Sequence, residues 1–493
     1  MIESLINKKN SFLESLSIMF VLRLTLIITN CYLVDINFYY YNKINYIRIF
    51  IKLSIMIDLK IESKILILLL LILTIASVPV YAQDSISINN STYGIDYTQK
   101  TPQVNTSSQR TYYITPYTKP CNKKILKYNT YNKYTKNYYT MLSYMQKFEK
   151  YGGGTLILKR GTYYISNAVT IPSNVNLIFE DGVVINKGTK TGTRKYKAAQ
   201  SMFQLVQPSK LKKKNAYSGY NGVKNVNIIG RGNVVINMRY INKSTAIICG
   251  HAKNIQIQGI TFRNMYTGHF IEVDAINGMK ISNCKFISSK RSAVLNGEAI
   301  NLDIPDKNTQ GFNNIWSRAD KTPNNNILIE NNLFYGLDRA IGSHKYSQWS
   351  INGKYVTNKG QVYHKWITIR NNRIINMRSD PIHVLNWRNV VITNNYIANV
   401  VKNSHYYRGI LAGGAVNLTI KNNYFENMYR PLEVMVTKNN GVGSMYSITY
   451  NSLTRENYAD IANNYCYNVV ESYARISFGY RYYVNMVKLN LLT

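Results

Sequence analysis

The chain has 493 residues, and its 60 Lys and Arg residues outnumber its 24 Asp and Glu residues, giving a formal net charge of +36. A surface this basic favours anionic partners such as uronate polysaccharides or phosphate-bearing wall glycans, although Lys, Asn, Ile and Tyr are enriched together, as they are when the coding DNA is rich in A and T. The cysteines after residue 82 are widely spaced and match no zinc-binding pattern, which argues against a zinc cluster and against redox chemistry.

A secretory signal is predicted over residues 56–82. It has a basic start after Met56, an apolar run from Ile65 to Leu73 and a small-residue exit at Ala82, so that Gln83 would begin the mature protein. The apolar run is too short for a membrane span. We therefore expect an extracellular or cell-surface protein that does not bind nucleic acid and is not stably inserted in a membrane.

Two further segments lie outside the predicted main domain. Residues 1–55 are either upstream sequence translated from a misplaced start, which we favour, or an additional membrane segment broken by Glu14 and Arg23. Residues 83–128 are rich in Ser, Thr, Tyr and Gln with few aliphatic residues, which indicates a linker or a loose N-terminal cap.

A short helix is expected at the start of the main domain. Met141, Leu142, Met145 and Phe148 have helical spacing, and three glycines at 152–154 would end the helix. Residues 155–163 would then form a strand-rich first coil. We assign residues 129–475 to one repeat domain and residues 476–493 to a C-terminal tail.

A six-residue phrase, Ile-x-Asn-Asn-x-Phe, recurs with small variations through the second half of the chain. The copies and degenerate copies begin at Ile257, Ile281, Ile329, Ile369, Ile392, Ile420 and Ile448. Their spacings are 24, 48, 40, 23, 28 and 28 residues, so we interpret the two long intervals as coils that carry insertions. The unit is about two dozen residues, the length of one solenoid coil, and each copy is too short to bury its own apolar residues unless it stacks on its neighbours.

The phrase also predicts how a coil turns. Asn tolerates the left-handed backbone of a tight corner and can hydrogen-bond the next Asn along the stack, which would form an internal Asn ladder. Cys284 occupies the second Asn position of that ladder and is expected to be a buried free thiol. A second apolar alternation follows most anchors, as in Phe270–Val273, and its period of two indicates several short strands per coil and parallel sheets.

These features resemble the right-handed parallel β-helix superfamily of pectate lyases and polygalacturonase-like glycoside hydrolases, from about residue 130 to 470. The resemblance implies an all-β, single-stranded right-handed parallel β-helix with a short N-terminal capping helix. An all-β sandwich is the alternative fold, but sandwiches do not repeat a phrase in register. Because this fold carries hydrolases, lyases, epimerases and binding proteins, the function has to come from a site.

The strand register predicts outward columns of ionisable residues, since equivalent residues of stacked coils lie about 4.8 Å apart. The first column comprises His269, Glu298, Arg339, Asp380, Arg408 and Arg430. The second comprises Glu272, Asn301, Gly342, His383, Leu411 and Glu433, and the third comprises Asp274, Asp303 and His344. The alternative is that these are ordinary solvated groups on one face of the solenoid.

Aromatic residues fall on the same coils. All four tryptophans, Trp316, Trp349, Trp366 and Trp387, lie between residues 310 and 390, and Tyr346 lies near them. Flat rings offer an apolar platform to the C–H faces of sugars. We therefore predict that Trp349, Trp366, Trp387, Tyr346, Arg339, His269 and His383 bind substrate, although any single His is more often structural.

Glycoside hydrolysis needs one carboxylic acid to protonate the leaving oxygen and a second carboxylate as base or nucleophile. Asp274 and Asp303 would lie about 5 Å apart in one column, and proximity would raise the pKa of one of them. Asp303 is therefore the candidate general acid, with His344 as its proton partner. Further candidates for catalysis are Glu272, Glu298 and Asp380.

No signature of either enzyme family confirms this assignment. The Asn-Thr-Asp, Asp-Asp, Gly-His-Gly and Arg-Ile-Lys motifs of polygalacturonase-like enzymes are absent, and Ile341–His344 is only a loose echo of them. A lyase would use calcium and an arginine base, for which Arg339 is a candidate; otherwise no cofactor or metal is expected. Two functions stay open: a secreted, monomeric enzyme on an acidic polysaccharide, hydrolase before lyase, or a non-catalytic adhesin-like glycan-binding β-helix.

Overall fold

The structure, a computed structural model, describes residues 110–194, 196–291, 296–349, 360–436, 449–477 and 485–492. The predicted upstream segment 1–55, the signal peptide 56–82, most of the segment 83–128 and the anchor Ile448 lie outside the described residues. Across the described ranges, no helix has the length and apolar character needed to cross a membrane.

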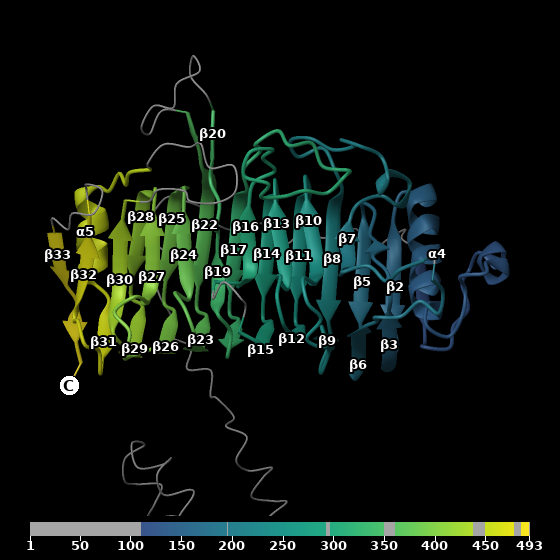
Figure 1. Cartoon of the computed structure of the whole chain (residues 1–493), viewed down its shortest axis with the longest axis horizontal. Helices are drawn as coiled ribbons and strands as arrows, with labels where there is room; N and C mark the ends of the chain where they lie inside the picture. Colours follow the sequence, from purple (N-terminus) through teal and green to yellow (C-terminus); the bar gives the residue numbers. More distant parts are fainter. Residues whose placement is uncertain are drawn as a thin grey trace, which may run out of the picture. The chain divides into compact units, whose positions relative to one another are not determined.

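Three long sheets wind around one apolar core and form a right-handed parallel β-helix, as predicted (Figure 1). Sheet A contains β1 (Thr111–Ile114), β2 (Gly154–Leu158), β5 (Val175–Phe179), β8 (Lys224–Gly230), β11 (Lys253–Gln258), β14 (Asn277–Ser282), β17 (Asn325–Glu330), β22 (His364–Arg370), β25 (Trp387–Thr393) and β28 (Val416–Lys421). Sheet B contains β3 (Gly161–Ile165), β6 (Val183–Lys187), β9 (Val235–Asn237), β12 (Thr261–Met265), β15 (Lys285–Ser289), β18 (Leu333–Tyr335), β23 (Arg373–Met377), β26 (Tyr396–Val400), β29 (Tyr424–Met428), β31 (Tyr465–Tyr467) and β34 (Asn490–Leu491).

Sheet C carries the predicted site residues. It contains β4 (Val169–Thr170), β7 (Ser201–Leu205), β10 (Thr245–Gly250), β13 (Ile271–Asp274), β16 (Glu298–Asp303), β19 (Arg339–Gly342), β24 (Ile382–Leu385), β27 (Arg408–Gly413), β30 (Arg430–Met435), β32 (Tyr473–Ile476) and β33 (Asn485–Lys488). All neighbours in this sheet are parallel except β32 and β33, which are antiparallel. A separate antiparallel pair, β20 (Ser347–Gln348) and β21 (Gln361–Val362), forms a hairpin outside the three sheets.

The anchors of the repeat are register partners in sheet A. Ile281 pairs with Ile329, and Ile329 pairs with Ile369, so each long interval is a single coil with an insertion. These side chains are fully buried, as are the sheet B residues Phe286 and Phe334, whose rings stack with centroids 4.8 Å apart. The repeated phrase therefore supplies the core, one layer per coil.

The Asn pair of the phrase divides two tasks between its members. The first member, for example Asn371 or Asn394, takes the left-handed backbone, with φ of 55° and 56°. The second member makes the ladder: Asn372 Nδ2 donates to Asn395 Oδ1 at 3.0 Å, and Asn395 Nδ2 donates to Asn423 Oδ1 at 2.9 Å. The sequence prediction gave both tasks to one residue, and the structure corrects that detail. Cys284 is a buried free thiol in the second position, as predicted.

Both ends of the solenoid are closed by elements of the chain itself. Helix α4 (Lys136–Tyr151) buries Met141, Met145 and Phe148 and ends at Gly152, whose φ of 79° suits glycine, so the predicted cap helix is confirmed. The 3-10 turn η3 (Lys123–Lys127) precedes it, and β1 pairs with β2. Because β1 belongs to sheet A, the domain starts before the predicted boundary at residue 129.

At the C-terminal end, helix α5 (Arg455–Ala462) contacts β28, and its first turn is closed by a capping box between Thr454 and Asn457. The predicted tail 476–493 is not separate, because β33 and β34 within it join sheets C and B.

The long connections lie at the two ends of the strands of sheet C, some before the strands and some after them. Residues 206–223, which include the 3-10 turn η4 (Pro208–Lys210), and residues 304–324 and 343–363 connect sheet C to sheet A. Residues 188–200, 290–297 and 401–407 connect sheet B to sheet C. In Figure 1 the connections after β7 and β16 run above the strands of this region. The outer face of sheet C therefore lies between two rows of connections.

We predict that Asn395→Leu destabilises the fold by about 1–3 kcal/mol, because the main-chain and side-chain N–H groups of Asn372 both lose Asn395 Oδ1 as acceptor in a buried position. The matched control is Asn394→Gly, which keeps the left-handed backbone and should change the unfolding free energy by less than about 1 kcal/mol. Chemical denaturation of both variants measures the difference. Equal effects would remove the ladder from the account of stability.

Candidate functional site

The predicted outward columns exist on sheet C. Glu272 pairs with Asn301, and Asp274 pairs with Asp303, on the adjacent strands β13 and β16. Glu298 pairs with Arg339 in the first column. The intervening residues of β16, Ile300 and Leu302, are fully buried in the core, so period-two alternation sends the charged residues outward.

A line of alternating charges runs along this face. Arg339 Nη1 contacts Glu298 Oε1 at 2.7 Å, and Arg339 Nη2 lies 3.5 Å from Asp380 Oδ2. Arg408 Nε then lies 3.2 Å from Asp380 Oδ1 and 3.3 Å from Glu433 Oε2. The residues of this line, hereafter the charge line, are Glu298, Arg339, Asp380, Arg408, Glu433, Arg430, Glu471 and Arg475.

Sequence reasoning placed most of the charge line but missed its last two members. Arg430 Nε contacts Glu471 Oε2 at 2.6 Å, and Arg475 also pairs with Glu471. Arg475 of β32 is the register partner of Glu433 of β30. The signal was present but overlooked, because a copy of the phrase begins at Ile461 and its Asn464 continues the ladder by accepting from Asn423 Nδ2 at 2.9 Å. The last anchor predicted from the sequence is Ile448 instead.

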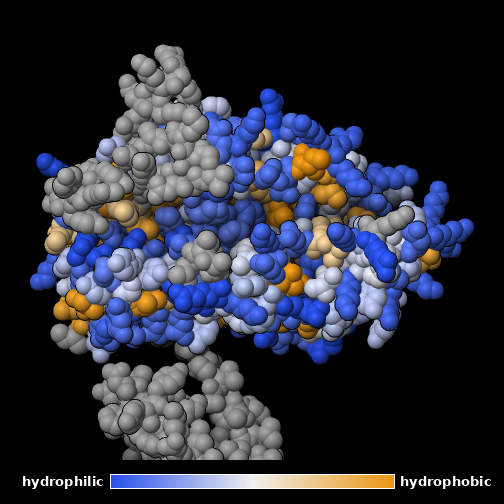
Figure 2. Space-filling model, in the orientation of Figure 1, coloured by the Kyte–Doolittle hydropathy of each residue, from blue (hydrophilic) through white to orange (hydrophobic). Residues whose placement is uncertain are grey.

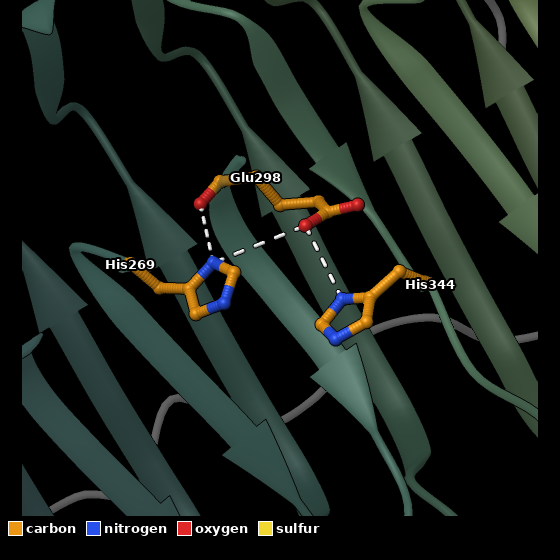
Figure 3. A group of neighbouring side chains, drawn as sticks. All are labelled: His269, Glu298 and His344. Atoms are coloured by element: carbon orange, nitrogen blue, oxygen red, sulfur yellow. Dashed lines mark hydrogen bonds and ion pairs between the residues drawn. The ribbon is translucent and has the colours of Figure 1, made fainter. Parts of the chain in front are cut away.

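His269, Glu298 and His344 converge at the other end of the line (Figure 3). His344 Nδ1 lies 3.4 Å from Glu298 Oε2, and its Nε2 lies 3.3 Å from Asp303 Oδ2. His269 Nδ1 hydrogen-bonds the main-chain oxygen of Glu298 at 2.7 Å, and its Nε2 lies 3.7 Å from Glu272 Oε2. His344 therefore faces a carboxylate on both sides, whereas His269 faces a main-chain oxygen on one side and the Glu272 carboxylate on the other.

This environment favours the charged form of His344. Burial lowers its pKa, but Asp303 and Glu298 outweigh that effect and raise the pKa to about 9. For Glu298, burial acts to raise the pKa, whereas His344 and Arg339 bring it well below the usual range. An imidazolium held between two carboxylates at neutral pH can donate a proton to a bound ligand.

Asp274 is a different kind of acid. It is fully buried, and neither carboxylate oxygen has a hydrogen-bond partner among the described residues. Burial raises its pKa well above the usual range, and Glu272 and Asp303 raise it further. Burial also raises the pKa of Glu272, which accepts a hydrogen bond from Asn301 Nδ2 at 2.9 Å. Burial and the neighbouring acids therefore favour the protonated form of Asp274.

Exposure decides which of these groups can meet a ligand. The side chain of His344 is 37% exposed and that of His269 16%, whereas Asp303 and Glu298 are at most 1% exposed. Asp303, predicted as the general acid, is thus behind His344 and cannot contact a ligand directly. Glu298 and Asp380 are buried in the charge line, and Glu272 is buried as well, with 11% of its side chain exposed.

The predicted binding residues divide in the same way. Arg339 is buried and holds Glu298 and Asp380. His383 sits half-buried in the second column, and burial followed by the positive charge of Arg339 lowers its pKa well below the usual range. Arg339 and His383 therefore lie under the exposed surface of the site, where they shape its charge.

The aromatic prediction needs correction. Trp387 is fully buried, with Nε1 donating to Ser343 Oγ at 2.9 Å, and Tyr346 is buried against Leu385, so neither can be a stacking platform. Trp366 is half-buried on β22 in sheet A, away from sheet C. Trp349, beside β20, is 53% exposed, with Lys321 Nζ 5.2 Å from its ring centroid, and it keeps its candidacy.

The group in Figure 3 also has the composition of a metal site, since one ligand atom from each residue lies within 4.8 Å of the others. His269 Nδ1 is engaged with a main-chain oxygen, which is the usual outer contact of a ligating His and leaves Nε2 for a metal. A cation here would have to displace the proton of His344. A small pocket opens beside this group, lined by Gly268, Phe270 and Glu298 among others.

No protein-family model matches the chain. It is 22% identical over 291 residues to plasmin and fibronectin-binding protein A of Streptococcus pneumoniae, a region that covers 56% of this chain and 35% of the relative. The chain thus spans about a third of the length of that curated relative.

Solved structures to which the chain is similar include the Streptococcus pneumoniae surface protein and adhesin PfbA, at 17% identity and a TM-score of 0.48 over 69% of this chain and 87% of that chain. An exopolygalacturonase from Thermotoga maritima has 13% identity and a TM-score of 0.39 over 71% and 91%. The tailspike of Escherichia coli bacteriophage HK620, in complex with a pentasaccharide, has 13% identity and a TM-score of 0.40 over 69% and 59%.

We predict a pH-dependent stability that His344 carries. Because its folded pKa is raised to about 9 from an ordinary value near 6.5, its stabilising effect is fully present below pH 6.5 and is lost as the pH rises to 9. Denaturation midpoints of wild type should fall over this window, and those of His344→Gln should fall less. The control is His405→Gln, at an exposed histidine outside the cluster. Parallel pH profiles for wild type and His344→Gln would contradict the assignment.

Proposed function

We propose that the protein is an exported, carbohydrate-active β-helix that binds an acidic polysaccharide on the outer face of sheet C and cleaves it by hydrolysis. One observation carries the proposal: His344 is exposed, and two buried carboxylates hold it charged. A purely structural ion pair needs no exposed imidazolium at the end of a buried line of charges. Hydrophilic residues dominate the face of the solenoid seen in Figure 2, which suits a polyhydroxylated ligand.

His344 is the proton donor in this proposal. Its imidazolium donates a proton to the glycosidic oxygen as the C–O bond breaks, and a water molecule adds to the sugar carbon. Glu272, whose largely buried side chain is 11% exposed beside His269, receives the proton of that water. Asp303 and Glu298 are positioning residues, because they orient and charge His344 without touching the substrate.

Hydrolysis is favoured over a lyase reaction by the state of Arg339. An arginine base would have to be exposed and free of strong partners, whereas Arg339 is buried between Glu298 and Asp380. Calcium, which a lyase would need, has no role in the hydrolytic proposal. The substrate is assigned as anionic because the chain as a whole is strongly basic.

A non-catalytic, adhesin-like role is the second candidate. It is favoured by the charge line, since Glu298, Asp380 and Glu433 are all paired with arginine and buried, as a structural framework requires. The names of the similar Streptococcus pneumoniae proteins, a plasmin and fibronectin-binding protein and an adhesin, fit this candidate. Surface exposure of a glycan-binding solenoid would serve either role.

The deciding experiment is a screen of pectin, alginate and wall glycans for reducing-end release and for the ultraviolet absorbance of unsaturated lyase products. With a substrate in hand, His344→Gln should lower turnover by about 10²- to 10⁴-fold while binding is kept, because the amide cannot donate the proton. Asp303→Asn should also lower turnover and should shift the alkaline limb of the pH profile downward, whereas His405→Gln should match wild type.

Two outcomes would separate the candidates. If wild type binds a glycan but releases no product of either kind, and His344→Gln binds equally well, the adhesin role stands. Trp349→Ala should weaken glycan binding in both roles, because it removes an exposed ring.

Export is part of the proposal. Expression from Met56 should give a secreted product whose first residue is Gln83, because only residues 56–82 combine a basic start, an apolar run and a small-residue exit. N-terminal sequencing of the exported protein checks this. A product that begins before Met56 would overturn the misplaced-start interpretation of residues 1–55.

A further inference from the structure

A small second hydrophobic core lies outside the solenoid, on the outer face of β7 and β10. It consists of Val206, Tyr217, Phe312 and Trp316, which we call the aromatic plug, and it is separate from the main core. Trp316 is 1% exposed and packs edge-on against Tyr217 and Phe312, with ring centroids 5.9 and 5.5 Å apart. Two insertions, 206–223 and 304–324, supply the plug.

The plug rests directly on the strands of sheet C. A Cβ atom added to Gly250 would lie 2.6 Å from Phe312 Cε1 and 2.8 Å from Trp316 Cη2, so only glycine allows the rings this close to β10. Trp316 Nε1 donates to Gln204 Oε1 of β7 at 3.1 Å. The outward positions of two coils are therefore occupied by side chains of the protein itself.

The two insertions are fastened to each other and to the solenoid. The main-chain N–H of Tyr217 donates to the oxygen of Trp316 at 2.9 Å, and Arg318 N donates to the oxygen of Tyr217 at 2.9 Å. The buried His251 hydrogen-bonds Gly219 O and Ser317 Oγ, both at 2.8 Å, and so ties one insertion to the other. The plug is a built part of the fold and not a loop that lies on the surface by chance.

The aromatic plug covers the outward columns of sheet C on the coils just before the candidate site. Ile248, which packs against it, is the register partner of Glu272, and Gly250 is the register partner of Asp274. Asp274 in turn pairs with Asp303, and His344 follows as the exposed member beside Asp303. At about 4.8 Å per coil, only a few sugar residues fit between the plug and His344.

We propose that the aromatic plug makes this protein specific for the ends of polysaccharide chains. A chain that lies along the coil axis cannot continue past β10, because Phe312 and Trp316 occupy the outward face there, so only a chain terminus fits against the plug with the adjoining linkage near His344. This inference rests on the proposed function and deepens it: the ligand is the terminal segment of a polysaccharide, and cleavage releases short products from that end.

Binding stoichiometry tests the inference without altering the aromatic plug. Size-fractionated polygalacturonate and alginate, and any further polymer that the screen identifies, are titrated with His344→Gln, which should bind without cleaving. End recognition predicts one protein per polymer chain whatever its length. A stoichiometry that grows in proportion to chain length would overturn the inference while leaving the proposed function intact.

Product analysis gives the second arm. Wild type should release short products from the first minutes while the viscosity of the polymer falls slowly, and Phe312→Ala/Trp316→Ala should shift toward internal cleavage, with a fast loss of viscosity and a stoichiometry above one. The single variant Phe312→Ala, checked for an unchanged thermal midpoint, replaces the double variant if the latter does not fold. Rapid viscosity loss with wild type would overturn end recognition. Failure of every polymer to bind or react would instead defeat the proposed function, and this inference with it.

Discussion

The coil-to-coil spacing of the parallel sheets is the constraint on which the rest of the structure depends. Equivalent residues of successive coils stand about 4.8 Å apart, so each outward column is a line of side chains in contact. Two like charges cannot be neighbours there without cost, and the charge line meets this by alternating Glu298, Arg339, Asp380 and Arg408. Burying such charges is expensive unless every one is paired, and so the removal of any member would leave its neighbours unpaired.

Among the described residues of sheet C, like-charged register partners occur at two places: Arg408 and Arg430 pair with each other and share Glu433, and the second place is the candidate site. Asp274 and Asp303 are register partners of the same charge, and the structure answers in two ways. The pKa of Asp274 is raised, so this carboxyl sheds its charge, and His344 takes up a proton opposite Asp303. The same coil spacing that lets opposite charges pair along the charge line thus also places Asp274 beside Asp303, and this like-charged pair makes the protonated His344 useful for chemistry. The coil spacing therefore governs both the pairing of the buried charges and the reactivity of the candidate site.

The fold could be predicted from the sequence because each of its signals is local and repeated. The Ile anchors, the Asn pairs and the glycine stop after Phe148 each specify backbone conformation within a few residues, and stacking follows from their repetition. The columns could be predicted too, since they need only the strand register. Exposure could not be, because it depends on insertions whose paths the repeat does not specify.

Trp387 shows why such errors arise. It follows Asn386, whose φ of 55° is left-handed and resets the alternation of inward and outward side chains at the corner between sheets C and A. Counting by two across that corner therefore assigns the wrong face, and the ring turns into the solenoid, where Nε1 finds Ser343. Trp316 escaped prediction for the opposite reason, because nothing local signals that an insertion folds back onto a neighbouring strand.

The net charge of the chain and the charges on the face of sheet C act at different stages of ligand binding. Seven of the 19 acidic residues after residue 82, namely Glu272, Asp274, Glu298, Asp303, Asp380, Glu433 and Glu471, lie on the outer face of sheet C, within a chain of net charge +36. The long-range field attracts an anionic polymer, whereas the face it reaches holds nearly balanced charges. An acidic ligand there meets paired carboxylates and an exposed imidazolium, so His344 is the group that can donate a proton to the ligand. Because Asp303 and Glu298 raise the pKa of His344, proton transfer depends on these two buried acids.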